Sequence, residues 1–380
     1  MINLGTLNLN MNSPINVLIG ENGCGKSYVL SQLARDSVEE KESIIAIATS
    51  VYDKFPRRNF AKNYHYMGAR LGRFIPREAV KQAISRINSY DSKGFFTLFQ
   101  VLDYVGYDQR IGFKVSQIEY SFDEVINNIT ELDNVQKNDL GRVFYGLKNH
   151  LSNTPDDVLW LKRNHAYHEI FDEFLTYILL HEKTLKKYKL IKSIDIYLSK
   201  QKKIFPLSHA SSGELSIIST LLFISSFIKD DTLILIDEPE NSLHPKWQKE
   251  FISMILDLFS YYEPNIIVAT HSPIVISGLH KELDVEIHKY TVDGFIRVIS
   301  DPKNAESIYD ELFDIVTPAS RELSNRCAGI LNDFSENKIS LDVAENALEI
   351  YKEKSYDDQQ IVFIDGIKEL LVKIQNNKAS

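Results

Sequence analysis

Four short apolar runs lie in two groups, which are separated by a long middle segment of the chain. They cover residues 15–19, 43–49, 232–236 and 265–269. Because these runs are nearly continuous rather than alternating, we expect each to form a strand that is buried on both faces of a parallel sheet. Three segments next to these runs have apolar side chains at helical spacing. Residues 28–38 follow the first run, and residues 215–228 and 247–259 lie on either side of the run at 232–236. This mixture of buried strands and helices predicts an α/β fold.

The middle of the chain has a different pattern, in which aromatic and charged residues are mixed. Helical spacing appears in residues 77–89 and 168–187, whereas residues 112–120 alternate like a strand. We therefore expect an inserted, mostly helical lobe at residues 51–204. It would interrupt a head built from residues 1–50 and 205–300.

The remaining patterns lie at the two ends of the chain. Residues 3–10 alternate weakly and predict a first short strand. Residues 284–299 predict a hairpin around Asp293-Gly294, a dipeptide that favours tight turns. Residues 304–376 are charged and helical in pattern, so residues 301–380 are predicted to form a helical C-terminal region.

Composition narrows the class of protein. The 380 residues are 44% apolar and 25% charged, with a net charge of −9, which is ordinary globular usage and argues against indiscriminate coating of nucleic acid. The two cysteines are Cys24 and Cys327, so a reducing, cytoplasmic setting is expected. No apolar run approaches the roughly 18 residues that span a bilayer, so no membrane partner is expected.

A glycine-rich segment follows the first buried run and precedes a predicted helix. It reads Gly20-Glu21-Asn22-Gly23-Cys24-Gly25-Lys26-Ser27. Glycines let such a loop curl so that its backbone N–H groups point at phosphate oxygens, and the helix N-terminus adds positive potential. Lys26 would then neutralise the β and γ phosphates, and the Ser27 hydroxyl would bind Mg²⁺. The order strand, loop, helix makes this a phosphate-binding loop (P-loop) rather than a chance turn.

Two carboxylates end the buried run at residues 232–236. Asp237 and Glu238 follow it directly, at the strand end where ligands bind in open parallel sheets. Asp237 would hold Mg²⁺ through water, and Glu238 would polarise an attacking water. Read alone, the same pattern also fits an ordinary strand end with solvated acids.

Two more segments fit an anion site. Ser211-Ser212-Gly213-Glu214 opens a helix 26 residues before Asp237, and a helix N-terminus can bind an anion or simply be capped by its serine. His271 follows the buried run at residues 265–269, so it would lie at the same sheet edge as the other candidates. Read singly, such a histidine is often only a capping or packed residue.

Together these segments resemble the head of an ABC-class P-loop ATPase. Asp237-Glu-Pro-Glu-Asn-Ser-Leu-His-Pro245 and Ala269-Thr-His-Ser-Pro273 resemble the RecF/SMC/OLD-like bacterial AAA ATPases more than transporter subunits. The resemblance is strong over residues 1–50 and 205–300 and loose elsewhere. It implies ATP and Mg²⁺ as cofactors and hydrolysis of ATP as the activity.

The resemblance also implies roles for single residues. Two heads would pair head-to-tail, with Asn241 and Ser242 in a loop between two ATP sites and His271 on the γ-phosphate. Lys26, Glu238 and His271 would be catalytic, and Ser27 and Asp237 would be the metal ligands. The nucleotide-binding set would be Asn22, Gly23, Cys24, Gly25, Lys26, Ser27 and Tyr28, with Ser211, Ser212, Gly213 and Glu214.

The pathway is less constrained than the chemistry. OLD-like proteins usually carry a C-terminal Toprim nuclease, but no Asp-x-Asp strand end follows His271. We therefore expect a homodimer or higher homo-oligomer that controls a co-encoded effector, a nuclease or toxin, in anti-phage defence. A RecF-like DNA-repair ATPase is the alternative, and a transporter nucleotide-binding subunit is a third.

DNA would bind through a lysine-rich stretch at residues 183–203. It holds Lys183, Lys186, Lys187, Lys189, Lys192, Lys200, Lys202 and Lys203 with Tyr188 and Tyr197. Lysines can neutralise phosphates and tyrosines can stack on bases. The same pattern also fits a solvated amphipathic face, and the sequence leaves both readings open.

Overall fold

The computed structural model describes residues 13–57, 59–72, 75–86, 92–116, 121–130, 132–151, 158–163, 169–241, 243–279, 284–298, 308, 312, 321–355 and 358–379. The strand predicted at residues 3–10 and the predicted loop residue Ser242 lie outside these ranges. The chain forms two compact units. The first unit contains Met1–Lys26, Pro245–Ile252 and Val268–Ser380, and the second contains Ser27–His244 and Ser253–Ile267.

A parallel sheet segment forms the base of the second unit. Its strands are β2 (Ile44–Ala48), β3 (Tyr64–Gly68) and β8 (Leu233–Asp237), and β2 pairs in parallel with both neighbours. Every residue of β2 and β8 is buried, as their continuous apolar runs predicted. Helix α7 (Ser212–Phe227) lies against β2 and β3. The sequence did not predict β3, because its Tyr-His-Tyr pattern is not a continuous apolar run.

A second sheet lies in the part of the chain that was predicted to be a helical lobe. Its strands are antiparallel in the order β5-β4-β6-β7. They are β4 (Arg110–Ser116), β5 (Leu159–Lys162), β6 (Ser193–Lys200) and β7 (Lys203–Pro206). The sequence predicted only the first of them.

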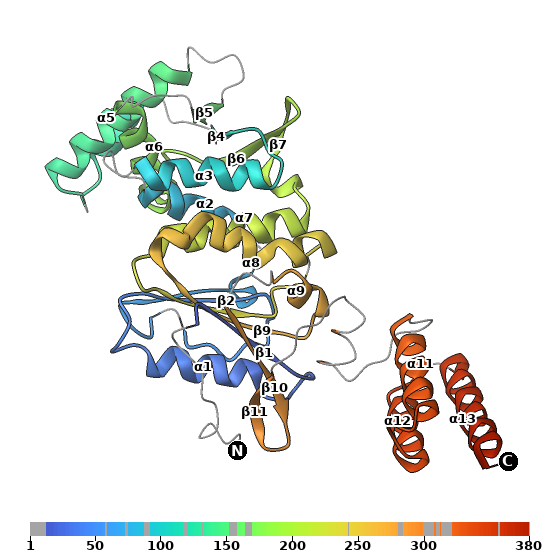
Figure 1. Cartoon of the computed structure of the whole chain (residues 1–380). Helices are drawn as coiled ribbons and strands as arrows, with labels where there is room; N and C mark the ends of the chain where they lie inside the picture. The colour runs from blue at the N-terminus through green and yellow to red at the C-terminus, as the bar shows by residue number, and fades with distance from the viewer. Residues whose placement is uncertain are drawn as a thin grey trace. The chain divides into compact units, whose positions relative to one another are not determined.

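Five helices accompany this sheet. They are α2 (Ile75–Arg86), α3 (Ser92–Tyr104), α4 (Phe122–Asn127), α5 (Asn134–Leu151) and α6 (Glu169–Lys187). Two of them, α2 and α6, match the predicted helices at residues 77–89 and 168–187. Both α2 and α3 pack against α7 (Figure 1). The antiparallel sheet is therefore joined to the parallel sheet segment within one unit.

The first unit has a sheet segment of its own. It contains β1 (Ile15–Ile19), β10 (Val285–Thr291) and β11 (Gly294–Val298); β1 and β10 are parallel, and β10 and β11 form an antiparallel hairpin. The predicted turn at Asp293-Gly294 is confirmed, and Gly294 has φ +107°. The other elements of the predicted head are α1 (Lys26–Asp36), α8 (Pro245–Phe259), β9 (Asn265–Thr270) and α9 (Pro273–Ser277).

The described end of the chain is helical, as predicted. Helices α11 (Arg321–Ser335), α12 (Leu341–Glu353) and α13 (Asp358–Ala379) form a bundle (Figure 1) with its own buried core. Cys327 lies in that core, where burial raises the pKa of its thiol to about 11. None of the helices described in this structure combines the length and the apolar character that crossing a membrane requires.

Gly278, in the turn after α9, lies very close to the backbone of α8. A Cβ added to Gly278 would lie 1.7 Å from the carbonyl oxygen of Lys249 in α8. We predict that Gly278→Ala lowers the free energy of unfolding by about 1–3 kcal/mol, because the helix backbones must separate. Urea-induced unfolding measures this difference.

The matched control is a glycine with room around it. A Cβ added to Gly329 in α11 would meet nothing within 4 Å. Gly329→Ala should raise the unfolding free energy by up to about 1 kcal/mol, since alanine favours helix more than glycine does. Equal stabilities of the two variants would contradict the close approach at Gly278.

Candidate functional site

The glycine-rich loop lies between β1 and α1, as predicted. Gly23 and Gly25 have φ values of +85° and +103°, a conformation that side chains other than glycine rarely adopt. The loop therefore needs glycine at both positions to curl as it does. Asn22 and Gly23 are exposed, whereas Cys24 and Gly25 are half-buried.

Lys26 closes this loop from the first turn of α1. Its side chain is only 4% exposed. The ammonium donates hydrogen bonds to the carbonyl oxygens of Gly20 (2.7 Å) and Glu21 (3.0 Å), and it lies 4.0 Å from the sulfur of Cys24. The positive charge is thus held across the loop. The next two residues of α1, Ser27 and Tyr28, are half-buried and exposed respectively.

The two predicted carboxylates lie at the end of β8. Asp237 is 1% exposed and pairs in register with Ala48, the last residue of β2. The next residue of the β2 chain, Thr49, donates its N–H to the Asp237 carbonyl (3.3 Å) and its hydroxyl to the Glu238 carbonyl. The ends of β2 and β8 therefore fix the backbone of both acids.

Glu238 has an unusual backbone conformation. Its φ is +52°, in the left-handed region, which costs a non-glycine residue about 1–2 kcal/mol. The Asn241 side-chain amide donates to the Glu238 carboxylate at 3.2 Å, so both ends of this residue are held. Strained residues that persist in this way cluster at functional sites. The contact from Thr49 was missed by the sequence analysis, because only the strand register shows it.

The segment at residues 211–214 forms the start of α7. Ser211 is the N-cap; its hydroxyl accepts from the Glu214 N–H at 3.3 Å, and the Glu214 carboxylate accepts from the Ser211 N–H at 3.1 Å. Ser211 and Ser212 are exposed, whereas Gly213 is buried. This reciprocal capping leaves the two serines at the surface of the helix end.

Glu214 has two further partners in its own chain. Tyr107 donates its hydroxyl at 2.7 Å and Lys200 its ammonium at 2.8 Å. Burial alone would raise the pKa of the Glu214 carboxyl, but the hydrogen bonds from Lys200, Tyr107 and Ser211 outweigh it and lower the pKa to about 2. Glu214, predicted to bind nucleotide, is therefore ionised and held by these donors.

His271 lies in the turn between β9 and α9 and is exposed. The turn is fixed on its far side by Ser272, whose N–H donates to the Thr270 hydroxyl and whose own hydroxyl donates to Gln248 of α8, both at 2.9 Å. Pro273 then starts α9. These bonds set the backbone position of His271.

The predicted residues are thus divided between the two units. Lys26 and His271 belong to the first, and Asp237, Glu238 and the start of α7 belong to the second. The predicted metal ligands, Ser27 and Asp237, offer a hydroxyl and a carboxylate, which are oxygen donors that suit Mg²⁺. Across the described residues, no three or more His, Cys, Asp or Glu side chains gather as a metal site. One hydroxyl and one carboxylate suit a Mg²⁺ ion whose other ligands would be water and phosphate oxygens.

Comparison with a protein family adds independent information. Residues 72–277 match the family described as "AAA domain, putative AbiEii toxin, Type IV TA system". The match covers more than half of the 380 residues. It includes Asp237, Glu238, His271 and the start of α7.

Single relatives are more distant. Protein ea59 of Escherichia phage lambda is 22% identical over an alignment of 304 residues that covers 73% of this chain and 49% of that protein. The chain thus spans about half the length of this curated relative.

Two solved structures are also similar. A "putative metal-chelate type ABC transporter" in an inward-facing conformation matches at 15% identity, with a TM-score of 0.36, over 82% of this chain and 81% of that one. The Smc head domain with an extended coiled coil, bound to the C-terminal domain of ScpA and derived from Pyrococcus furiosus, matches at 15% identity, with a TM-score of 0.24, over 63% and 62% of the two chains.

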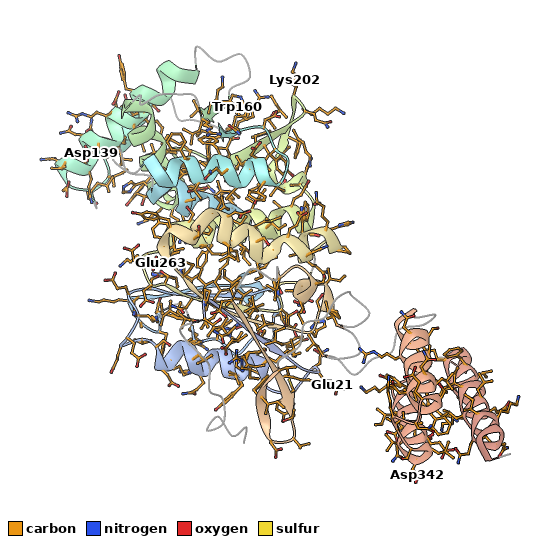
Figure 2. All side chains as sticks on the ribbon, in the orientation of Figure 1. Glu21, Asp139, Trp160, Lys202, Glu263 and Asp342 are labelled. Atoms are coloured by element: carbon orange, nitrogen blue, oxygen red, sulfur yellow. The ribbon has the colours of Figure 1, made fainter. Side chains whose placement is uncertain are left out.

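The left-handed conformation of Glu238 can be tested by stability. Glu238→Gly removes the side-chain contacts of Glu238, but glycine also relieves a backbone cost of about 1–2 kcal/mol. We therefore predict that the unfolding free energy falls by less than those side-chain contacts contribute. Glu263, labelled in Figure 2, is the matched control. It is an exposed glutamate with φ +46° and is not among the predicted site residues.

The control isolates the backbone effect. Glu263→Gly should raise the unfolding free energy by up to about 1 kcal/mol. The difference between the two variants in chemical unfolding then measures what the Glu238 side chain contributes, including its hydrogen bond from Asn241. The backbone carbonyl that Thr49 contacts is present in both the wild type and the glycine variant. A destabilised Glu263→Gly protein would contradict the left-handed assignment.

Proposed function

We propose that this chain, which belongs to that family of AAA domains, binds ATP and hydrolyses it as an ABC-type ATPase. The observation that carries the proposal is the P-loop. Its two left-handed glycines and a buried lysine ammonium held across the loop form the arrangement that receives the phosphates of a nucleotide. Backbone N–H groups of residues 22–28 would contact the phosphates, and Lys26 would exchange its carbonyl partners for phosphate oxygens.

The hydrolysis step follows from the two carboxylates. Glu238 would accept a proton from a water molecule as the water oxygen bonds to the γ-phosphorus and the bond to the bridging β–γ oxygen breaks. His271 would contact the γ-phosphate. Ser27 and Asp237 would hold Mg²⁺, which supplies charge neutralisation at the phosphates when bound. Thr49 and Asn241 support the proposal, because they fix the backbone and the carboxylate of Glu238.

The second half of each site would come from another copy of the chain. Ser211 and Ser212 are exposed at the N-terminus of α7, where the helix dipole favours an anion. We infer that this turn, with Ser212 and Gly213, faces the γ-phosphate bound by a partner copy, so that ATP joins two heads. Hydrolysis would then separate them, since the ligand that favours the paired state is lost.

The biological role we propose is control of an effector in bacterial anti-phage defence. The family description names a toxin and a toxin–antitoxin system, which supports a partner of this class. A nuclease or toxin encoded beside this protein would be held or released according to nucleotide state. Co-purification with that effector, compared in ATP and in ADP, tests this part of the proposal.

A RecF-like DNA-binding ATPase is the second candidate, favoured by one cluster of cations. Arg77, Lys81 and Lys186 all bind the buried carboxylate of Glu182. Burial, together with the charge of Arg77, lowers the pKa of Lys81 to about 8, and the Glu78 carboxylate lies 3.8 Å from the Lys81 ammonium. Duplex DNA binding that weakens steeply with salt would support this function, and absence of binding at low salt would exclude it.

The central prediction concerns Glu238→Gln. This change should keep ATP binding but slow hydrolysis by at least about 100-fold, because the amide cannot accept the proton. The variant should therefore double in mass in solution with ATP and Mg²⁺, as measured by light scattering. Lys26→Ala in the same background is the control, and it should stay a monomer.

Each outcome has a distinct meaning. A monomer with bound ATP would show that Ser212 and Gly213 are only the start of a helix capped by Ser211, and that the composite site is wrong. An assembly that forms equally without ATP would overturn the gating by nucleotide.

A second prediction uses the single cysteine of the P-loop. Cys24 is half-buried and 4.0 Å from the Lys26 ammonium. A maleimide on its sulfur should block ATP binding sterically, and bound ATP should slow the labelling. Cys327 is the internal control, since it is 0% exposed and should label only after unfolding. Equal labelling of Cys24 with and without ATP would contradict its placement at the phosphates.

A further inference from the structure

The first turn of α7 is bound to two distant parts of the second unit through one carboxylate. One oxygen of Glu214 accepts from Tyr107, which follows α3, and the other accepts from Lys200, the last residue of β6. Tyr107 is 3% exposed, and the Glu214 side chain is 14% exposed. The hydrogen bond from Tyr107 is therefore largely shielded from water, where a charged hydrogen bond is stronger than at the surface. The Lys200 side chain is 38% exposed, so its ion pair with Glu214 is only partly shielded.

The two partners of Glu214 are also joined to each other. The Lys200 ammonium lies 4.9 Å from the centre of the Tyr107 ring, within range of a cation–π interaction. Asp108 accepts from the Ser199 hydroxyl and from the Lys202 N–H, and its own N–H donates to the Ser199 carbonyl at 2.7 Å. The segment after α3 and the β6–β7 hairpin are thus hydrogen-bonded to each other, and both contact Glu214.

Helix capping alone does not require this arrangement. A capping box needs only a side-chain oxygen at its third position, and glutamine supplies one as well as glutamate does. The negative charge of Glu214 matters instead for Lys200, whose ammonium donates to the second carboxylate oxygen. The sequence analysis found the cap signal but not these partners, which are 107 and 14 residues away.

We propose that Tyr107 and Lys200 are positioning residues that set the orientation of the Ser211–Gly213 turn toward nucleotide. This inference rests on the proposed function, since it assumes that the turn contacts ATP bound by a partner copy. The β6–β7 hairpin is the element that carries Lys200, and its turn residues Gln201 and Lys202 are both left-handed, with φ +52° and +65°. Lys202 lies at the tip of this hairpin (Figure 2). Lys200 therefore contacts the first turn of α7 from a hairpin that is not part of that helix.

The proposal predicts a specific kinetic pattern. Lys200→Met should lower the kcat of ATP hydrolysis by about tenfold or more, because a small misplacement of a positioning contact is costly. The KM for ATP should stay within about twofold, because the P-loop that binds ATP in the same chain is unchanged. Lys200→Arg should restore most of kcat, since it keeps the charge.

Two comparisons separate positioning from general effects. Lys203→Met removes an equal charge from the same hairpin. Among the described residues, Lys203 forms no hydrogen bond or ion pair with Glu214 or Tyr107, so this variant should behave as wild type. Glu214→Gln keeps the cap, and combining it with Lys200→Met should cost no more kcat than either change alone, because the two residues act as one unit. Tyr107→Phe should show the same split between kcat and KM.

The assembly provides a readout that does not depend on turnover. In a Glu238→Gln background, Lys200→Met should raise the protein concentration at which ATP doubles the mass by about tenfold, while Lys203→Met should not change it. Thermal unfolding checks that all variants are folded at the assay temperature.

The failures are distinguishable. If the wild type neither hydrolyses ATP nor pairs with it, the proposed function is wrong. If the wild type does both, and Lys200→Met and Tyr107→Phe match it in kcat and in assembly, the positioning role is overturned while the proposed function stands. The positioning role is also overturned if Lys203→Met loses as much kcat as Lys200→Met, or if the effects of Glu214→Gln and Lys200→Met add.

Discussion

The pairing of β2 with β8 is the constraint on which the candidate chemistry of the second unit depends. Both strands are fully buried, and their parallel register places Ala48 opposite Asp237. Thr49 can therefore reach the carbonyls of the two acids, and it holds Glu238 in a conformation that an isolated chain would avoid. A shift of one residue would turn every side chain of β8 to the opposite face. The apolar core thus fixes where the carboxylates lie.

Much of this arrangement could be predicted from the sequence, because it depends on local patterns. Continuous apolar runs predicted β1, β2, β8 and β9, since strands covered on both faces have no polar side. The glycine spacing predicted a loop that curls, and the structure has left-handed backbone at Gly23 and Gly25. The Ser211 cap was also visible, because the residues that form it are neighbours in the chain.

The rest could not be predicted, because it depends on contacts between distant segments. Strands β5, β6 and β7 are short or of mixed polarity, so their patterns do not separate them from loops. Without the register of β6, nothing in the sequence brings Lys200 close to Glu214. Without the register of β2 on β8, nothing brings Thr49 close to Glu238. From the sequence alone, Ser211, Ser212 and Glu214 were therefore all predicted to contact nucleotide. In the structure their surroundings differ, since the serines are exposed and the carboxylate is held by its own chain.

That difference suggests how the start of α7 can serve two purposes. If a second copy completes the site, the N-terminal end of α7 must stay exposed to that copy. The residues that fix the orientation of this end must therefore contact it on the side that faces its own chain. Glu214 is suited to this because it lies in the first turn, where the helix dipole also favours a negative charge. Its ionised carboxylate can bind Tyr107 and Lys200 on one side while leaving Ser211 and Ser212 exposed on the other. Any change in the hairpin that moves Lys200 would then act on the exposed turn without touching the nucleotide.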